Sequence, residues 1–177
     1  MRIIGGRLKG LRLNPPNNLP VRPTTDLAKE ALFNILNNQL DFEGLKVLDL
    51  FSGTGNIAME FASRDAEKVI AVDRAQQCVF YLKDMAAKHK FPEIIVFKAD
   101  VFKFLEMETE PYDLIFADPP YDLDKIPQLP NAVFTRQLLV ADGLLIIEHP
   151  AYQNLSNQPN FSEKRIYGNT AFSFFKG

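Results

Sequence analysis

Four consecutive residues, Asp118-Pro119-Pro120-Tyr121, combine side chains that could do chemistry on an exocyclic amine. They directly follow the apolar run 112–117, and a strand there would project them into a cleft. The carboxylate and a backbone carbonyl could accept both N–H bonds of the amine, and the prolines would stiffen this pair of acceptors. The ring of Tyr121 offers a face on which an extruded base can stack. We therefore predict that Asp118, Pro119, Pro120 and Tyr121 are catalytic residues, which hold an amine nitrogen in line with a methyl donor.

A second motif lies upstream, where Asp49-Leu50-Phe51-Ser52-Gly53-Thr54-Gly55 separates an apolar run from a helical pattern that begins at Asn56. The unpaired N–H groups of a helix's first turn favour an anion, whereas Asp49 would favour a cation or a hydroxyl group. An amino acid headgroup carries both charges, as the methionine end of S-adenosylmethionine does. The glycines also satisfy the dinucleotide fingerprint Gly53-x-Gly55-x-x-Ala58, but a pyrophosphate would not favour Asp49 as a neighbour. The motif therefore predicts S-adenosylmethionine as the cofactor.

An acidic residue stands at the carboxyl end of each of four predicted strands: Asp49, Asp73, Asp100 and Asp118. In a doubly wound sheet, ligands bind over the carboxyl ends of the strands. Asp73 lies about 20 residues after Gly53, the spacing at which an acid binds ribose hydroxyls. Asp100 could accept a hydrogen bond from the adenine amino group, with the N–H of Val101 beside it. The predicted cofactor-binding residues are Asp49, Phe51, Ser52, Gly53, Thr54, Gly55, Asp73, Arg74, Asp100 and Val101.

The elements that must position these residues alternate along the chain. Strands are predicted at 47–50, 68–73, 94–97, 112–117 and 144–148, followed by an antiparallel hairpin at 163–167 and 170–175. Helices are predicted to begin at 56 and to span 75–90, 101–105 and 132–140. Pro127 and Pro130 would keep the preceding loop irregular, and Asp142-Gly143 would form a turn. This alternation predicts an α/β fold with a parallel sheet and right-handed crossovers.

The first 25 residues contain five basic and no acidic side chains, although the net charge of the whole chain is −2. Residues 2–13 are predicted to form a small hairpin. A helix follows, with Thr24 or Thr25 as its N-cap and Asp26 in its first turn. Its predicted buried stripe consists of Leu27, Ala28, Ala31, Leu32, Ile35 and Leu36. The charge asymmetry makes this arm the predicted nucleic-acid-binding surface, with contacts from Arg2, Arg7, Lys9, Arg12 and Arg22.

Other residue types argue against several classes of protein. Cys78 is the only cysteine, so no internal disulfide can form, which suits a reducing cytosol. His89 and His149 are isolated and are predicted to be ordinary surface or edge residues, so no metal site is expected. No apolar run approaches transmembrane length, and residues 1–7 lack the apolar region of a signal peptide. We therefore expect a cytoplasmic protein with neither a metal nor a membrane partner.

Together, the segments 49–55 and 118–121 resemble those of class I S-adenosylmethionine-dependent amino methyltransferases. Residues 2–6, 22–26 and 30–34 narrow this resemblance to the RsmD family, bacterial enzymes that methylate a guanine N2 of 16S ribosomal RNA. The resemblance implies a Rossmann-like fold with a seven-stranded, mostly parallel sheet and an antiparallel C-terminal hairpin. It also implies that the enzyme acts on RNA within an assembling small ribosomal subunit, and we expect the basic arm to contact that RNA. The expected organisation is a single methyltransferase domain over 1–177, with an N-terminal extension at 1–44 and the catalytic core at 45–177.

Three other functions fit parts of the pattern. A DNA adenine-N6 or cytosine-N4 methyltransferase would use the same segment 118–121, but no segment is long enough for a separate DNA recognition domain. A nicotinamide-dependent oxidoreductase would use the glycine turn and leave 118–121 unexplained. A non-catalytic ribosome-assembly binder would bind RNA without turnover.

Overall fold

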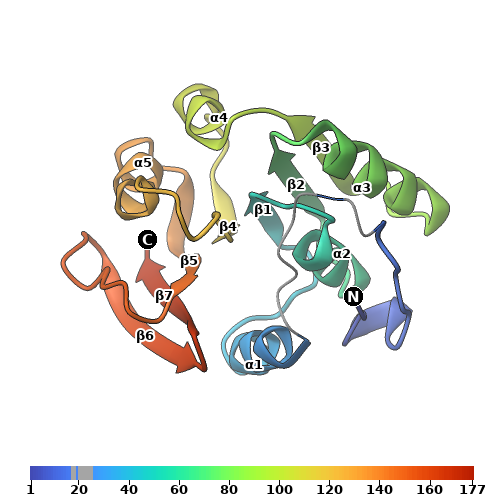
Figure 1. Cartoon of the computed structure of the whole chain (residues 1–177), viewed down its shortest axis with the longest axis horizontal. Helices are drawn as coiled ribbons and strands as arrows, with labels where there is room; N and C mark the ends of the chain where they lie inside the picture. Colours follow the sequence, from blue (N-terminus) through green and yellow to red (C-terminus); the bar gives the residue numbers. More distant parts are fainter. Residues whose placement is uncertain (17–18, 20–25) are drawn as a thin grey trace.

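A seven-stranded sheet runs through the centre of the protein, in the order β3-β2-β1-β4-β5-β7-β6 (Figure 1). The structure is a computed structural model and describes residues 1–16, 19 and 26–177. Its strands are β1 (Lys46–Leu50), β2 (Lys68–Asp73), β3 (Ile94–Lys98), β4 (Tyr112–Ala117), β5 (Leu139–Pro150), β6 (Phe161–Tyr167) and β7 (Thr170–Lys176). The first five strands pair in parallel, whereas β7 pairs antiparallel with both β5 and β6. The predicted α/β sheet with an antiparallel C-terminal hairpin is confirmed.

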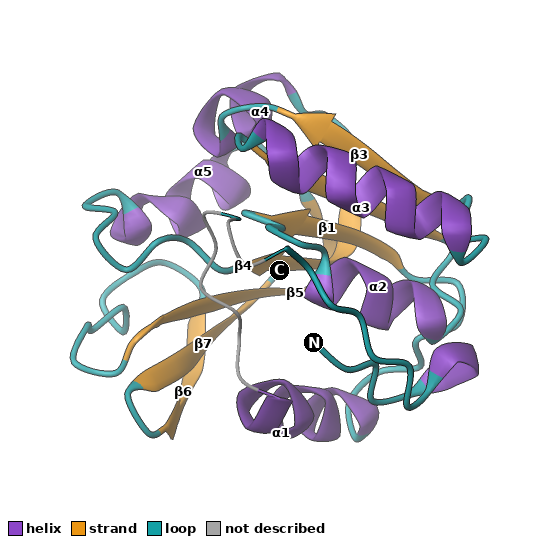
Figure 2. Cartoon of the chain, turned by 45° about the vertical axis from the view of Figure 1, so that its right-hand side comes forward, coloured by secondary structure: helices purple, strands orange, loops and turns teal. Residues whose placement is uncertain are grey.

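Helices cover both faces of this sheet (Figure 2). They are α1 (Asp26–Asn37), α2 (Asn56–Ser63), α3 (Gln76–Lys88), α4 (Val101–Met107) and α5 (Leu129–Thr135), with 3₁₀ turns η1 (Gly6–Leu8) and η2 (Ile126–Gln128). Side chains alternate between the two faces along a strand, so Val47 packs in the core under α1, α2 and α3 while Leu48 packs in the core under α4 and α5. No helix in the described part of the chain is long and apolar enough to cross a membrane.

The order of the strands creates a place for a ligand. β1 lies between β2 and β4, and it pairs in parallel with both. The connections after β1 and β4 therefore leave toward opposite faces of the sheet, which opens a crevice over the carboxyl ends of these strands. The segments that follow β1, β2 and β4 are those whose residues the sequence singled out.

The N-terminal arm doubles back on itself, but not as a regular hairpin. Three backbone hydrogen bonds close it: Ile3 N to Leu11 O at 2.9 Å, Gly10 N to Ile3 O at 2.8 Å and Leu13 N to Met1 O at 2.9 Å. Arg2 and Arg12 form a single isolated bridge, and the 3₁₀ turn η1 replaces the expected ladder. The predicted N-cap, Thr24 or Thr25, lies outside the described residues, whereas Asp26 does stand in the first turn of α1.

The buried face of α1 differs from the predicted stripe. Leu27 is 73% exposed, whereas Lys29 and Phe33 are fully buried beside Leu32 and Leu36. The helix is rotated because Phe33 packs against Phe61, with ring centroids 5.0 Å apart, and because Lys29 finds an acidic partner inside. Apolar periodicity cannot reveal a buried lysine whose partner lies on another helix.

The region from 129 to 150 also differs from the prediction. The helix expected at 132–140 is α5, which begins earlier, because Pro130 stands in its first turn, where proline is tolerated. It ends at Thr135, and Val140 belongs to β5. Asp142 has a left-handed φ of 62° and lies inside β5, where the register with β4 shifts, so the expected turn at Asp142-Gly143 is a bulge.

His149 is fully buried in β5, so its prediction as a surface or edge residue is wrong. β5 is an interior strand because β7 pairs along its outer side. The imidazole Nδ1 lies 2.9 Å from the carbonyl of Pro150, to which it donates, so Nε2 accepts from the hydroxyl of Ser173 at 2.7 Å. Burial lowers the pKa of His149, in keeping with this neutral tautomer.

Candidate active site

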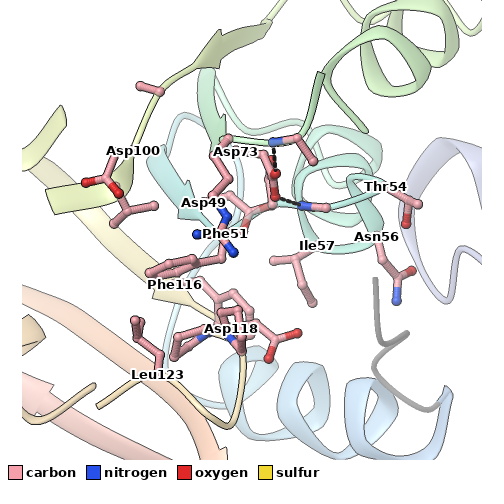
Figure 3. A pocket seen from close by; sticks show the side chains of 18 of the residues that line it. Asp49, Phe51, Thr54, Asn56, Ile57, Asp73, Asp100, Phe116, Asp118 and Leu123 are labelled. Carbon is pink, nitrogen blue, oxygen red and sulfur yellow. Dashed lines mark hydrogen bonds between the residues drawn. The ribbon is translucent and has the colours of Figure 1, made fainter. Parts of the chain in front are cut away.

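A cavity of about 850 Å³ lies over the carboxyl ends of β1, β2 and β4 (Figure 3). All of the predicted catalytic and cofactor-binding residues except Gly55 line it. It therefore brings together Asp49, Phe51, Ser52, Gly53, Thr54, Asp73, Arg74, Asp100, Val101, Asp118, Pro119, Pro120 and Tyr121. Two motifs about 70 residues apart in the chain thus share one cavity, as parallel strands joined by crossovers require.

Further residues line the cavity that the sequence did not single out: Asn56, Ile57, Ala75, Ala99, Phe102, Phe116, Asp122 and Leu123. Most of them are immediate neighbours of predicted residues, so a wider window around each motif would have included them. Phe116 gave no such signal, because a phenylalanine in a buried strand is typical of a core.

Asp49 is an almost fully buried acid at the end of β1, with 1% of its surface exposed. Its Oδ2 accepts a hydrogen bond from the N–H of Ala58 at 3.0 Å, in the first turns of α2. Burial raises the pKa of this carboxyl to about 8, against the smaller opposing effect of that hydrogen bond. An acid in this state gains charge readily when a cation binds beside it.

The glycine turn after β1 is held by its own backbone. Ser52 N donates to Val72 O at 3.0 Å, and Gly55 N donates to Ser52 O at 2.8 Å. Phe51 adopts a left-handed φ of 60°, which is rare for a residue with a side chain and common at ligand sites. Gly53 lines the cavity, as expected of a residue that a ligand approaches.

Gly55 has a structural role that the sequence alone did not reveal. It precedes α2 with a left-handed φ of 78°, and a Cβ there would lie 2.2 Å from a methyl carbon of Leu82 on α3. Only glycine fits both this backbone conformation and this close packing of two helices. Gly55 therefore shapes the turn without facing the cavity.

Asp73 and Asp100 are oriented by nearby backbone N–H groups. The Oδ2 of Asp73 accepts from Gly53 N and its Oδ1 accepts from Ala75 N, each at 2.8 Å (Figure 3). Asp100 is the N-cap of α4, where its Oδ1 accepts from Lys103 N at 3.1 Å. Both carboxylates line the cavity while they hold their own loops.

The segment from Asp118 to Tyr121 forms the opposite wall. Asp118 N donates to Leu50 O at 3.3 Å, which places this residue beside the glycine turn. Pro119 is buried and Pro120 is exposed. The hydroxyl of Tyr121 lies 2.7 Å from Thr170 Oγ1 and 3.4 Å from Glu148 Oε1, two residues of the C-terminal strands.

A buried charge cluster, unforeseen from the sequence, joins the N-terminal arm to this site. Lys29 Nζ lies 2.5 Å from Arg2 O, 2.8 Å from Asn56 Oδ1 and 3.2 Å from Glu60 Oε2. Both charged side chains are fully buried, and burial lowers the pKa of Lys29. Glu60 also accepts the N–H groups of Ile4 and of the following residue, at 2.8 Å each. Since Asn56 lines the cavity, the cluster connects the arm with the cavity wall.

The predicted basic contacts divide into two groups. Arg2 pairs with Glu30 at 2.5 Å, and Arg7 pairs with Glu93, so these two arginines bind the arm to the core. Lys9 and Arg12 are exposed, and neither has an ion pair among the described residues. The fifth predicted contact, at position 22, lies outside the described part of the chain.

Metal ligands do not cluster in the part of the chain that the structure describes: no group of three or more His, Cys, Asp or Glu residues there could hold a metal ion. Cys78 is buried in α3 with a free thiol, and burial raises its pKa to about 11. The chemistry available in the cavity is therefore that of oriented carboxylates, backbone N–H groups and aromatic rings.

Known proteins share both the sequence and the fold. The model of a family described as "Conserved hypothetical protein 95" matches residues 1–176. Ribosomal RNA small subunit methyltransferase D of Buchnera aphidicola subsp. Baizongia pistaciae is 30% identical over 90% of this chain and 82% of its own. The protein of the same name from Escherichia coli K12 is 29% identical over 99% of this chain and 89% of its own.

Solved structures also superpose on this chain. A hypothetical protein of Thermus thermophilus superposes with a TM-score of 0.86 at 28% identity, over 100% of this chain and 99% of that one. RsmC, a 16S rRNA N2 methyltransferase of the same organism, was solved with AdoMet and guanosine. It superposes with a TM-score of 0.73 at 20% identity, and the match spans 89% of this chain and 45% of the RsmC chain. That second likeness shows a shared class I methyltransferase fold. The family model matches almost the whole chain, and relatives named ribosomal RNA small subunit methyltransferase D match most of it. The chain therefore belongs to the RsmD family.

Proposed function

We propose that this protein transfers a methyl group from S-adenosylmethionine to the exocyclic N2 amine of a guanine in 16S ribosomal RNA. The observation that carries the proposal is the single cavity that joins the acid-lined turn after β1 to the segment from Asp118 to Tyr121. At about 850 Å³ it lies within the range of about 300–1,000 Å³ that is usual for ligand sites. The relatives named as ribosomal RNA small subunit methyltransferases support an rRNA substrate.

The cofactor side of the cavity matches the parts of S-adenosylmethionine. The ammonium group would lie against Asp49, and the carboxylate would lie near the N–H groups at the start of α2. Asp73 would accept from the ribose hydroxyls, and Asp100 with the N–H of Val101 would meet the adenine edge. When bound, this cofactor supplies an electrophilic methyl group on a sulfonium ion.

The opposite wall would present the guanine. Its amine is a weak nucleophile because the nitrogen lone pair is delocalised into the ring. The Asp118 carboxylate and a carbonyl of the adjacent prolines would accept its two N–H bonds and aim the lone pair at the methyl carbon. When the nitrogen bonds to the methyl carbon, the bond between that carbon and the sulfonium sulfur would break, with S-adenosylhomocysteine as the leaving group. The fixed Asp118 carboxylate would stabilise the positive charge that develops on the nitrogen, which would then lose one proton to solvent. RsmC, which shares this fold, was solved with AdoMet and guanosine, a cofactor and a nucleoside of the kinds that this proposal places in the cavity.

The N-terminal arm would contact the RNA through its exposed basic side chains. Lys9 and Arg12 are the candidates, because Arg2 already pairs with Glu30 of α1 and Arg7 with Glu93. With a net charge of −2, the protein as a whole would not bind nucleic acid indiscriminately. This balance suits docking on an assembling small subunit in the cytoplasm, where ribosomal proteins share in recognition.

The test is to incubate the protein with methyl-labelled S-adenosylmethionine and small subunits from cells that lack this enzyme. The RNA is then digested and the labelled nucleoside identified. We expect one labelled species, N2-methylguanosine. Label in another nucleoside would contradict the guanine-N2 chemistry, and label only in a DNA control would favour a DNA methyltransferase. RNA binding without any label would favour an assembly factor.

A further inference from the structure

The hydroxyl of Tyr121 is held by residues from the far end of the chain. Thr170 begins β7 and Glu148 lies in β5, and these two strands pair with Pro150 opposite Thr170. The distances are 2.7 Å from Tyr121 Oη to Thr170 Oγ1 and 3.4 Å to Glu148 Oε1. The C-terminal hairpin therefore reaches the rim of the cavity through one phenol group.

The direction of these hydrogen bonds follows from their chemistry. A carboxylate only accepts, so the single proton of Tyr121 is directed toward Glu148 and the hydroxyl of Thr170 donates to Oη. Glu148 is 4% exposed, so its carboxylate has little access to water and favours protein donors. In this arrangement the hydroxyl protons of Thr170 and Tyr121 both have an acceptor.

Packing covers only part of the Tyr121 ring. Tyr121 is half-buried, and its neighbours Pro120 and Asp122 are exposed. A ring that is to stack on a base must lie at a defined place in the cavity. Hydrogen bonds at the hydroxyl fix the far end of the ring axis, at the point farthest from the backbone.

We propose that Thr170 and Glu148 are positioning residues that fix the direction of the Tyr121 ring axis and so the place of the ring in the cavity, which makes the C-terminal hairpin a part of the active site. The catalytic consequence rests on the proposed function, because the place of the ring matters for turnover only if a base stacks on it. The position of the ring itself does not depend on that function. The two statements therefore have separate tests.

The first test observes the ring without any reaction. The chain has five tyrosines, so labelling with tyrosine enriched in ¹³C at the ring carbon that bears the hydroxyl gives five signals. The signal lost in Tyr121→Phe identifies Tyr121. We expect this signal to shift in Thr170→Val and in Glu148→Gln, and to keep its wild-type position in Thr170→Ser, which retains the hydroxyl. An unmoved signal in Thr170→Val would overturn the tether.

The second test is a double-mutant cycle on the single-turnover rate of methyl transfer to small subunits. Thr170→Val removes the hydrogen bond between Thr170 and Tyr121, and should slow transfer by about fivefold. Tyr121→Phe removes that hydrogen bond together with the one to Glu148, and should slow transfer by at least as much. The double variant should be no slower than Tyr121→Phe alone, instead of showing the product of the two losses, because the two changes share one interaction. Thr170→Ser should restore the rate, and Tyr167→Phe, a neighbouring change in the same hairpin, should leave it unchanged.

The outcomes separate the two proposals. If the wild type labels guanine but the two losses multiply, or Tyr121→Phe transfers at the wild-type rate, the positioning role is overturned and the proposed function stands. If the wild type labels no guanine, the proposed function fails, while the ring signals still decide the tether. Melting temperatures on the same samples identify any variant that has merely lost its fold, and Thr170→Ser then carries the test.

Discussion

The two walls of the cavity are built in different ways. The wall proposed for the cofactor, here called the cofactor wall, contains Asp49, Asp73 and Asp100, and their carboxylates accept hydrogen bonds from backbone N–H groups between 2 and 20 positions away in the sequence. The wall proposed for the guanine, here called the base wall, is the segment from Asp118 to Tyr121. There the hydroxyl of Tyr121 is hydrogen-bonded to residues 27 and 49 positions away. One wall is organised locally, and the other is organised by the sheet as a whole.

This difference predicts how the walls respond to substitution. The acids of the cofactor wall hold nearby loops, and in the proposed function they would also hold the ligand, so their loss should affect binding and local structure together. On the base wall, prolines stiffen the segment and distant strands hold it, so a single side chain there can be removed with the frame intact. Substitutions on the base wall should therefore separate catalysis from cofactor binding.

The largest effect is expected at Asp118. Asp118→Ala removes one fixed acceptor of the amine, which typically costs on the order of 10²–10³ in rate. Binding of S-adenosylhomocysteine should stay within a few-fold of wild type, since the cofactor wall is untouched. Single-turnover rates and calorimetry on the same samples measure both quantities. Asp124→Ala, an exposed acid outside the cavity, is the matched control. Near wild-type transfer by a folded Asp118→Ala protein would show that this acid is no catalytic residue.

At Asp73 the expected loss is in affinity. Asp73→Ala should weaken S-adenosylhomocysteine binding by at least about tenfold, because hydrogen bonds to a charged acceptor contribute roughly 1.5–3 kcal/mol. Asp73→Asn keeps one oxygen as an acceptor for a loop N–H, so it should bind better than the alanine variant. Calorimetry compares the two variants. Equal affinities would mean that Asp73 acts through its charge alone and that its loop hydrogen bonds are unimportant to the site.

The sequence correctly predicts that the acids at the ends of β1, β2 and β3 share one cavity, because their positions depend on local structure. Apolar runs followed by single acids indicate where strands end, and the spacing from Gly53 to Asp73 reflects one strand–helix–strand unit. The same reasoning correctly placed Asp118 to Tyr121 in the cavity.

Contacts between distant residues leave no such pattern. Lys29 lies in an apolar stripe position on α1 only because Glu60, on another helix, neutralises it. Thr170 and Glu148 meet Tyr121 only because β7 pairs with β5. His149 is buried for the same reason, since the strand pairing that covers β5 comes from the last segment of the chain.

Asp49 should make cofactor binding depend on pH. Its pKa of about 8 lies above its usual value of 3.8, so the unliganded protein should lose stability as pH rises from about 4 to about 8. An ammonium group favours the ionised acid, so affinity should rise by up to about tenfold per pH unit as pH approaches 8 from below. Asp49→Asn should flatten both dependences. Calorimetry and melting curves over this range provide the measurement, and an unchanged pH slope in Asp49→Asn would exclude this role.

The smallest effect is expected at the arm. Replacing Lys9 and Arg12 together by alanine should weaken binding to small subunits a few-fold and lower the slope of log affinity against log salt by about 2. Cofactor affinity should not change. Lys103→Ala with Lys176→Ala makes the same change of charge away from the arm and serves as the control. Filter binding at several salt concentrations tests this, and equal losses in both double variants would show that the arm contributes only general charge.

The most direct measurement of the central claim, that one cavity brings cofactor and guanine together between two walls, is a crystal structure with S-adenosylhomocysteine and guanosine bound. The account predicts the amino acid end of the cofactor against Asp49, its ribose at Asp73, and the guanine on Tyr121 with N2 within hydrogen-bond distance of the Asp118 carboxylate. A cofactor outside this cavity, or a guanine whose N2 points away from Asp118, would contradict it.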